Sequence, residues 1–191
     1  MKQNRENPFF ETYRTPFGTP PFDQIETEQY EPAFDEGIWQ LDEEVRAIAD
    51  NTELPTFENT IIALERSGKL LDKVISAFFN VLNAEADDEM MDISQRVSPK
   101  LSESSNNIYL NEQLFARVKS VYDRKDELHL PMEDARLLEK TFEAFCARGA
   151  ALGPEEKEKY RKLSSELSLL SLTFDQNALK DKNRYELLLT K

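Results

Sequence analysis

A single apolar stripe over residues 57–82 constrains the fold of this 191-residue chain more than any other feature. Its members recur at alternating steps of four and three residues, which is the spacing that places side chains on one face of an α-helix. They are Phe57, Ile61, Leu64, Gly68, Leu71, Ile75, Phe78 and Leu82. Such a helix packs against neighbouring helices at a shallow angle. If it is straight, about 28 residues give a length of roughly 40 Å.

Both the start and the middle of this segment carry signals. Thr56 follows Pro55 and is predicted to cap the helix, with Glu58 in its first turn. Gly68 lies on the apolar stripe itself. It either allows a second helix to approach closely or marks a bend at Ser67 and Gly68.

Similar stripes predict further helices on both sides. The first helix begins near Thr27, which we expect to cap it, and ends before Pro55. Its buried stripe consists of Tyr30, Phe34, Ile38, Leu41, Val45 and Ile48. A later helix opens at Asp87 and Asp88 and contains Pro99, where we expect a kink.

The C-terminal half predicts three more helices. Asn106, Asn107 and Asn111 indicate a turn, after which a fourth helix carries Leu114, Phe115, Val118, Val121 and Tyr122. A fifth begins after Pro131, buries Leu137, Leu138, Thr141, Phe142 and Phe145, and ends near Arg148 and Gly149. Pro154 suits the first position of a last helix, which buries Tyr160, Leu163, Leu167, Leu170 and Phe174 and fades near Lys180.

The sequence therefore predicts an all-α protein, a multi-helical antiparallel bundle of about six helices. Only five glycines and many helix-forming residues support this class. Residues 1–26 are predicted to form an irregular arm packed on the body, because prolines interrupt regular structure while Phe9, Phe10, Phe17 and Phe22 favour burial. Residues 27–191 form the helical lobe. Mutual packing of the helices is a simpler use of their stripes than an intermolecular coiled coil.

Charge and cysteine content restrict the partners and the compartment. The chain has 24 basic and 37 acidic residues, a net charge of −13, which disfavours nucleic acid and anionic membranes as partners. No stretch of about 18 apolar residues is present to span a membrane, and Met1 to Asn7 do not resemble a signal peptide. The single cysteine, Cys146, fits a reducing compartment, so we expect a cytoplasmic protein and a buried thiol.

The sequence predicts no catalytic, cofactor-binding or metal-binding residues. His129 is the only histidine, and Pro131 separates it from Glu133, so the two do not share a helical face. Three clusters of acidic residues fall on polar helix faces or in first turns, where solvation and the helix dipole explain them. Ser164, Ser165, Ser168 and Ser171 lie along one helix without a histidine to activate them.

Four stretches nevertheless resemble the N-terminal region of the thimet oligopeptidase family of zinc peptidases, in particular its bacterial peptidyl-dipeptidase and oligopeptidase A branch. The most specific is residues 55–61 (Pro-Thr-Phe-Glu-Asn-Thr-Ile), followed by Ala63 to Glu65 and by Ser67 and Gly68. The others are residues 21–25 with 30–34 and Gly37; residues 98–101 with 110–111; and residues 137–139 with Phe174 and 177–179. The resemblance covers nearly the whole chain from about Asn7.

This resemblance implies a helical lobe of a longer enzyme. In the family, two lobes enclose a deep channel, and zinc in a downstream lobe activates the water that hydrolyses short peptides. We therefore expect this chain to be a non-catalytic N-terminal lobe that forms part of the channel wall. It would hold no cofactor itself, and zinc is expected in the full-length parent. Its partners would be its own catalytic lobe and, in that parent, short peptides.

Two alternatives remain open at this point. A free-standing helical module would bind a partner through an apolar groove, without enzymatic activity. An enzyme in its own right would need chemistry that these residues do not supply. Leu187, Leu188 and Leu189 favour the lobe, because three consecutive leucines are expected to dock on another part of a longer chain.

Overall fold

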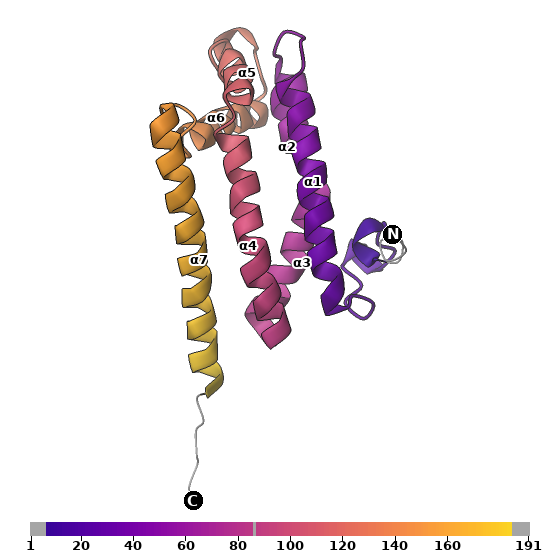
Figure 1. The fold of residues 1–191 in the computed structure, drawn as a ribbon. Coiled ribbons are helices and arrows are strands. Elements are labelled where there is room, and N and C mark those ends of the chain that lie inside the picture. The colour runs from indigo at the N-terminus through magenta and orange to yellow at the C-terminus, as the bar shows by residue number, and fades with distance from the viewer. Residues whose placement is uncertain (1–6, 86, 185–191) are drawn as a thin grey trace, which may run out of the picture.

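Long antiparallel helices lie side by side in the computed structural model, which describes residues 7–85 and 87–184 (Figure 1). The α-helices are α1 (Tyr30–Ala49), α2 (Ala63–Glu65), α3 (Lys69–Glu85), α4 (Asp88–Tyr109), α5 (Glu112–Tyr122), α6 (Met132–Ala147) and α7 (Pro154–Arg184). Since α2 is a three-residue continuation of the π-helical turn η5 (Phe57–Ile62), six longer helices remain. No strand occurs among the described residues. The predicted all-α class and the number of helices are confirmed.

Helix α4 lies in the middle of this arrangement. Figure 1 shows α1 and α3 on one side of α4 and α7 on the other, with α5 and α6 at one end. The tail at Leu187 to Leu189, for which we predicted docking, lies outside the described residues, as do residues 1–6.

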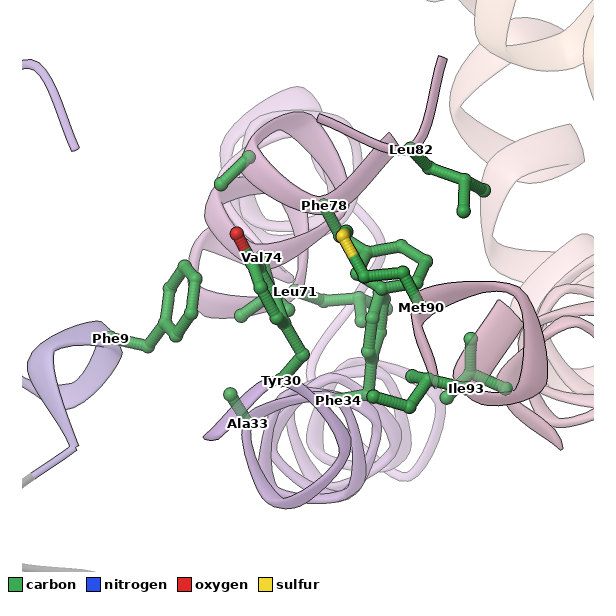
Figure 2. Packing of buried hydrophobic residues seen from close by; sticks show 12 residues of the cluster. Phe9, Tyr30, Ala33, Phe34, Leu71, Val74, Phe78, Leu82, Met90 and Ile93 are labelled. Carbon is green, nitrogen blue, oxygen red and sulfur yellow. The ribbon is translucent and has the colours of Figure 1, made fainter. Parts of the chain in front are cut away.

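An apolar core fills the space between α1, α3 and α4. Phe34 and Phe78 are fully buried, and their rings meet edge to face with centroids 5.3 Å apart. Tyr30, which lies in α1 like Phe34, also contacts Phe78, and the centroids of the two rings are 5.0 Å apart. Met90 and Ile93 of α4 complete the cluster (Figure 2). Edge-to-face aromatic pairs stabilise a core by about 0.5–1.5 kcal/mol beyond the burial of their area. Tyr30, Phe34, Leu71, Phe78 and Leu82 of the two predicted stripes are buried in this core, whereas Ile38, Leu41 and Ile75 are only partly buried.

A second core lies at the other end of the bundle, between α5, α6 and the turn η5. Leu114, Val118 and Phe145 are fully buried in it. Beside it, the buried guanidinium of Arg117 donates hydrogen bonds to the carbonyl oxygens of Asn51 at 2.6 Å and Glu53 at 3.0 Å. These bonds attach the connection after α1 to α5.

The long stripe over residues 57–82 is buried, but it does not form one straight helix. Residues 66–68 interrupt it, and Gly68 has a φ of +74°, a left-handed conformation that glycine adopts at little cost. A Cβ at Gly68 would lie 3.1 Å from Cδ1 of Leu41. Both predicted uses of this glycine, the bend and the close approach, therefore apply, whereas the alternative of a straight helix is wrong.

Several predicted helix ends are confirmed. The Thr56 hydroxyl accepts a hydrogen bond from the Asn59 amide at 3.1 Å, while the Asn59 side chain accepts one from the Thr56 amide at 2.8 Å. This reciprocal pair satisfies amides that the helix leaves without partners. Asp87 caps α4 by accepting a hydrogen bond from the Met90 amide, and Asn111 caps α5 by accepting one from the Leu114 amide. Pro131 precedes α6, and Pro154 is the first residue of α7.

Other predicted ends were wrong. Residues Thr27–Gln29 form a 3-10 turn before α1, and the amide of Glu26, rather than a group on Thr27, bonds the Gln29 side chain. Asn106 and Asn107 do not form a turn, because α4 continues to Tyr109. The predicted position of Pro99 inside α4 is confirmed, and the kink expected there stays a prediction.

Over residues 7–26 the chain forms two short 3-10 turns, Pro8–Phe10 and Pro16–Gly18, and contacts the helical body. Phe9 is buried against Tyr30, with ring centroids 5.2 Å apart (Figure 2). Lys73 of α3 donates hydrogen bonds to the carbonyl oxygens of Phe9 and Glu11 at 2.8 and 2.6 Å. The prediction that all four arm phenylalanines avoid water was wrong, since Phe17 is fully exposed and Phe22 is half exposed.

Candidate functional site: the two faces of α7

Helix α7 contacts the rest of the protein mainly through α4, and side-chain hydrogen bonds occur along this contact. Gln176 of α7 is buried and donates hydrogen bonds to Oγ of Ser94 at 3.0 Å and to the Met91 carbonyl oxygen at 3.2 Å. Gln95 donates in turn to the Gln176 side-chain oxygen at 3.0 Å. Nearer the start of α7, Asn106 donates to Ser164 at 2.9 Å. These bonds fix which face of α7 lies against α4.

A buried lysine fixes the beginning of α7. Lys157 is 8% exposed, and its ammonium group lies 3.0 Å from a carboxylate oxygen of Glu112 and 3.4 Å from the carbonyl oxygen of Leu110. The pair connects the first turn of α7 to the start of α5. The ion pair of Lys157 and the hydrogen bonds of Ser164 and Gln176 all form on the side of α7 that faces the bundle, and together they fix its rotation about its axis.

Another face of α7 carries a row of exposed apolar side chains. Leu163, Leu167, Leu170 and Phe174 are 65%, 64%, 60% and 72% exposed, respectively. Because they are spaced at four, three and four residues, they share one face of α7. The prediction that this stripe is buried was wrong for these four residues, and only Tyr160 is half-buried. We call these four residues the α7 row.

A groove of about 460 Å³ runs between α4 and α7. Serines spaced at four and three residues line it from both helices: Ser98, Ser102 and Ser105 on α4, and Ser164, Ser168 and Ser171 on α7. Arg148 also lines it, donating a hydrogen bond to Ser105 at 3.1 Å, with its guanidinium 4.2 Å from the centre of the Tyr109 ring. The matching serine spacing on two helices is the sequence signal that could have predicted this polar contact.

The residues considered as catalytic candidates are not brought together. His129 is exposed in a turn with a φ of +48°, and Glu133 is exposed in the first turn of α6. Cys146 is exposed, so its predicted burial was wrong. It follows the buried Phe145 directly, and adjacent helix positions point in different directions.

The acidic clusters hold backbone and side-chain groups of the fold. Glu44 accepts a hydrogen bond from the Gly68 amide at 2.7 Å, and Asp42 accepts one from Ser104 at 3.1 Å. Asp87 caps α4 through the Met90 amide at 2.8 Å, and Glu156 accepts from the Gly153 amide at 3.1 Å. Each of these four carboxylates therefore accepts a hydrogen bond from another part of the fold or from its own helix end.

The described residues do not fit a zinc ion. Within residues 7–85 and 87–184, no three His, Cys, Asp or Glu side chains are close enough to share a metal ion, and a catalytic zinc commonly takes three protein ligands. No helix among these residues is long and apolar enough to cross a membrane.

Comparison with known proteins identifies relatives of this chain. No model of a known protein family matches the chain. Over 173 residues, however, it is 43% identical to dipeptidyl carboxypeptidase from Escherichia coli K12, a match that covers 91% of this chain and 25% of that protein. This chain is homologous to the N-terminal region of peptidases of the thimet oligopeptidase family.

Other relatives give the same partial coverage. Dipeptidyl carboxypeptidase from Salmonella typhimurium is 39% identical, covering 91% of this chain and 25% of the relative. Oligopeptidase A from Escherichia coli K12 is 23% identical, covering 86% of this chain and 24% of the relative. The chain thus spans about a quarter of the length of the relatives it matches, as the sequence resemblance predicted.

Proposed function

We propose that this chain is the non-catalytic N-terminal lobe of a peptidyl-dipeptidase or oligopeptidase that hydrolyses short peptides, and that it forms part of the wall of the substrate channel. The observation that carries the proposal is the 43% identity over 173 residues to one quarter of a dipeptidyl carboxypeptidase. The zinc ion and the reacting residues would belong to the part of the peptidase outside this chain. The cytoplasmic location stays part of the same proposal.

The contribution of such a lobe to catalysis is steric. A rigid wall limits the size of substrate that enters and restricts the orientations of a bound peptide, which lowers the entropic cost of reaching the transition state. Two apolar cores and a helix fixed by buried polar contacts give this lobe the rigidity that a wall requires.

A chimera tests the proposal. The homologous quarter of the Escherichia coli dipeptidyl carboxypeptidase is replaced by this chain, and hydrolysis of a short peptide is measured beside the unaltered enzyme and the isolated chain. We expect the chimera to hydrolyse the peptide and to bind zinc, and the isolated chain to do neither. A folded chimera without activity, or stoichiometric zinc and turnover in the isolated chain, would contradict the proposal.

The exposed α7 row also favours a second candidate, a helical interaction module without enzymatic activity. An amphipathic helix that presents apolar side chains at steps of three and four is a common way to recognise another protein. This candidate predicts a saturable complex between the isolated chain and one purified partner, together with an inactive chimera. The two candidates therefore differ in the result of the same experiment.

A further inference from the structure

The outer surface of α7 carries apolar residues on the side that faces away from the rest of the lobe. A surface helix normally directs its apolar face toward the core and its polar face toward water. In α7 the buried side carries Lys157 and Gln176, while the α7 row faces outward. Figure 1 shows α7 at the edge of the bundle, with α4 on one side of it.

The orientation of α7 is fixed by specific contacts. Turning the row toward α4 would remove the Gln176 bonds to Ser94 and Met91 and would expose the Lys157 contact with Glu112. It would also place apolar side chains against the hydroxyls of the serine groove, leaving buried polar groups without partners, which costs about 1–3 kcal/mol for each group. The α7 row therefore stays on the outer surface of the bundle, where only a polypeptide segment from outside the bundle can bury it.

The size and continuity of the row distinguish it from isolated exposed apolar residues. Trp39, Leu54 and Met132 are also exposed, but they lie on three different elements or connections. The α7 row instead spans eleven residue steps on one helix (from Leu163 to Phe174), or about 16 Å at 1.5 Å per residue. Contiguous exposed apolar surface of this kind marks a protein contact.

We propose that the α7 row is the docking surface for the remaining polypeptide of the peptidase. That polypeptide corresponds to the three quarters of the relatives that lie outside this match. The inference rests on the proposed function and names the surface through which the lobe joins the enzyme. The length outside the match identifies the occupant, because relatives that share this lobe carry it within a chain about four times as long.

A second copy of this chain fits the row less well. The net charge of −13 makes two copies repel each other, and the repulsion opposes a helix-to-helix dimer. The remaining polypeptide is connected to the lobe, so docking is intramolecular and does not lose the translational freedom that a separate partner loses.

The experiment compares the same substitutions in two settings, the isolated 191-residue chain and the chimera with the Escherichia coli dipeptidyl carboxypeptidase. Leu163, Leu167 and Leu170 are changed together to Gln, which removes the apolar surface and keeps helix propensity. The matched control is Leu169→Gln. Leu169 lies on the same helix, is 41% exposed and points about a third of a turn away from the row.

In the isolated chain we expect the triple variant to keep the midpoint of thermal unfolding, because the three side chains already face water. In the chimera we expect it to lower that midpoint by about 5 °C or more and to reduce peptide hydrolysis, while Leu169→Gln changes either value much less. The contrast between the two settings is what docking predicts and what a purely internal role of α7 does not.

The other outcomes separate the two proposals. If the unaltered chimera is active and the triple variant matches it in stability and activity, the docking inference is overturned and the proposed function stands. An isolated chain that sediments as a dimer, and as a monomer after the triple substitution, would assign the row to a second copy. If the unaltered chimera folds without activity, the proposed function fails and the docking inference fails with it.

Discussion

The two sides of α4 pack through different kinds of contact. Toward α1 and α3, α4 presents Met90, Ile93 and Val97, which are almost completely buried in an aromatic and aliphatic core. Toward α7 it presents Ser94, which accepts a hydrogen bond from Gln176, and Asn106, which donates one to Ser164. The first contact is held by loss of apolar surface from water and the second by hydrogen bonds, each worth only about 0.5–1.5 kcal/mol net.

The contacts with α4 therefore fix the orientation of α7 but contribute less to its stability than an apolar contact would. Hydrogen bonds between specific groups fix the rotation of a helix, because each bond requires one geometry. Burial of apolar area is less specific but contributes more stability. A helix held in register by polar contacts, with its apolar face outward, is suited to form the middle layer between this bundle and another part of a protein.

The apolar side of α4 should show the largest effect of a single substitution. Phe78 is fully buried and contacts Tyr30, Phe34 and Phe79. We expect Phe78→Ala to reduce the free energy of unfolding by about 3–5 kcal/mol, because it removes buried area and leaves a cavity. Urea denaturation followed by circular dichroism measures the change.

Phe17→Ala is the control for that substitution, because it removes the same ring from a fully exposed position. We expect a change within about 0.5 kcal/mol, typical of surface positions. If Phe78→Ala and Phe17→Ala were equally mild, the aromatic core would not be the main source of stability on this side.

On the polar side we expect a smaller effect. Gln176→Ala removes the bonds to Ser94, Met91 and Gln95 and should reduce the free energy of unfolding by about 1–2 kcal/mol. Hydrogen exchange gives the sharper measurement, because amide protection should fall in α7 while that of α3 is kept. Asn177→Ala, at an exposed neighbouring position, controls for helix propensity.

A double substitution sharpens the comparison. Ser94→Ala combined with Gln176→Ala should cost less than the sum of the two single changes, because both remove the same bond. Strict additivity would show that the bond to Ser94 contributes little, and that Gln176 acts through its bonds to Met91 and Gln95. A loss of protection in α3 as large as that in α7 would show that the two sides of α4 unfold as one unit.

The sequence predicts the apolar side of the bundle much better than the polar side. Spacing identified the buried faces over residues 30–48 and 57–82, because each apolar stripe there has its partner stripe within the same chain. The straight helix through Gly68 was wrong, since the glycine that fits the stripe also adopts a positive φ. Leu163 and Phe174 have equally good spacing and are exposed. Periodicity shows which face of a helix is apolar, but it does not show whether the surface that buries this face belongs to the same bundle.

The candidate site was less predictable for the same reason. Gln176 and Ser94 are polar residues in helices, and their burial follows only from the pairing of α4 with α7. Cys146 was expected to be buried because of its phenylalanine neighbours, but exposure is set by the helix position and not by the nearest residues in sequence. The homology was recognisable from residues 55–61, since local capping groups such as Thr56 and Asn59 are read directly from the sequence.

The smallest expected effect concerns a polar atom on the apolar side. The hydroxyl of Tyr13 is buried without a hydrogen-bond partner among the described residues, and its ring lies 3.7 Å from the Lys73 ammonium group. Burial, with a smaller contribution from Tyr30, raises the pKa of Tyr13 from 10.0 to about 12. Burial also lowers the pKa of Lys73, against the opposing effect of Glu11.

The raised pKa of Tyr13 makes the free energy of unfolding fall as the pH rises above about 10. A group whose pKa is higher in the folded state stabilises the fold fully below its unfolded pKa, and this stabilisation is lost as the pH rises from about 10 to about 12. We therefore expect Tyr13→Phe to leave the free energy of unfolding nearly unchanged at pH 7 and to weaken its decrease above pH 10. The lowered pKa of Lys73 acts in the opposite direction in both proteins, so the difference between the two curves isolates Tyr13. Parallel curves from pH 7 to 12 would show that the Tyr13 hydroxyl reaches water, and the arm would then be packed less tightly against α3 than the Lys73 contacts indicate.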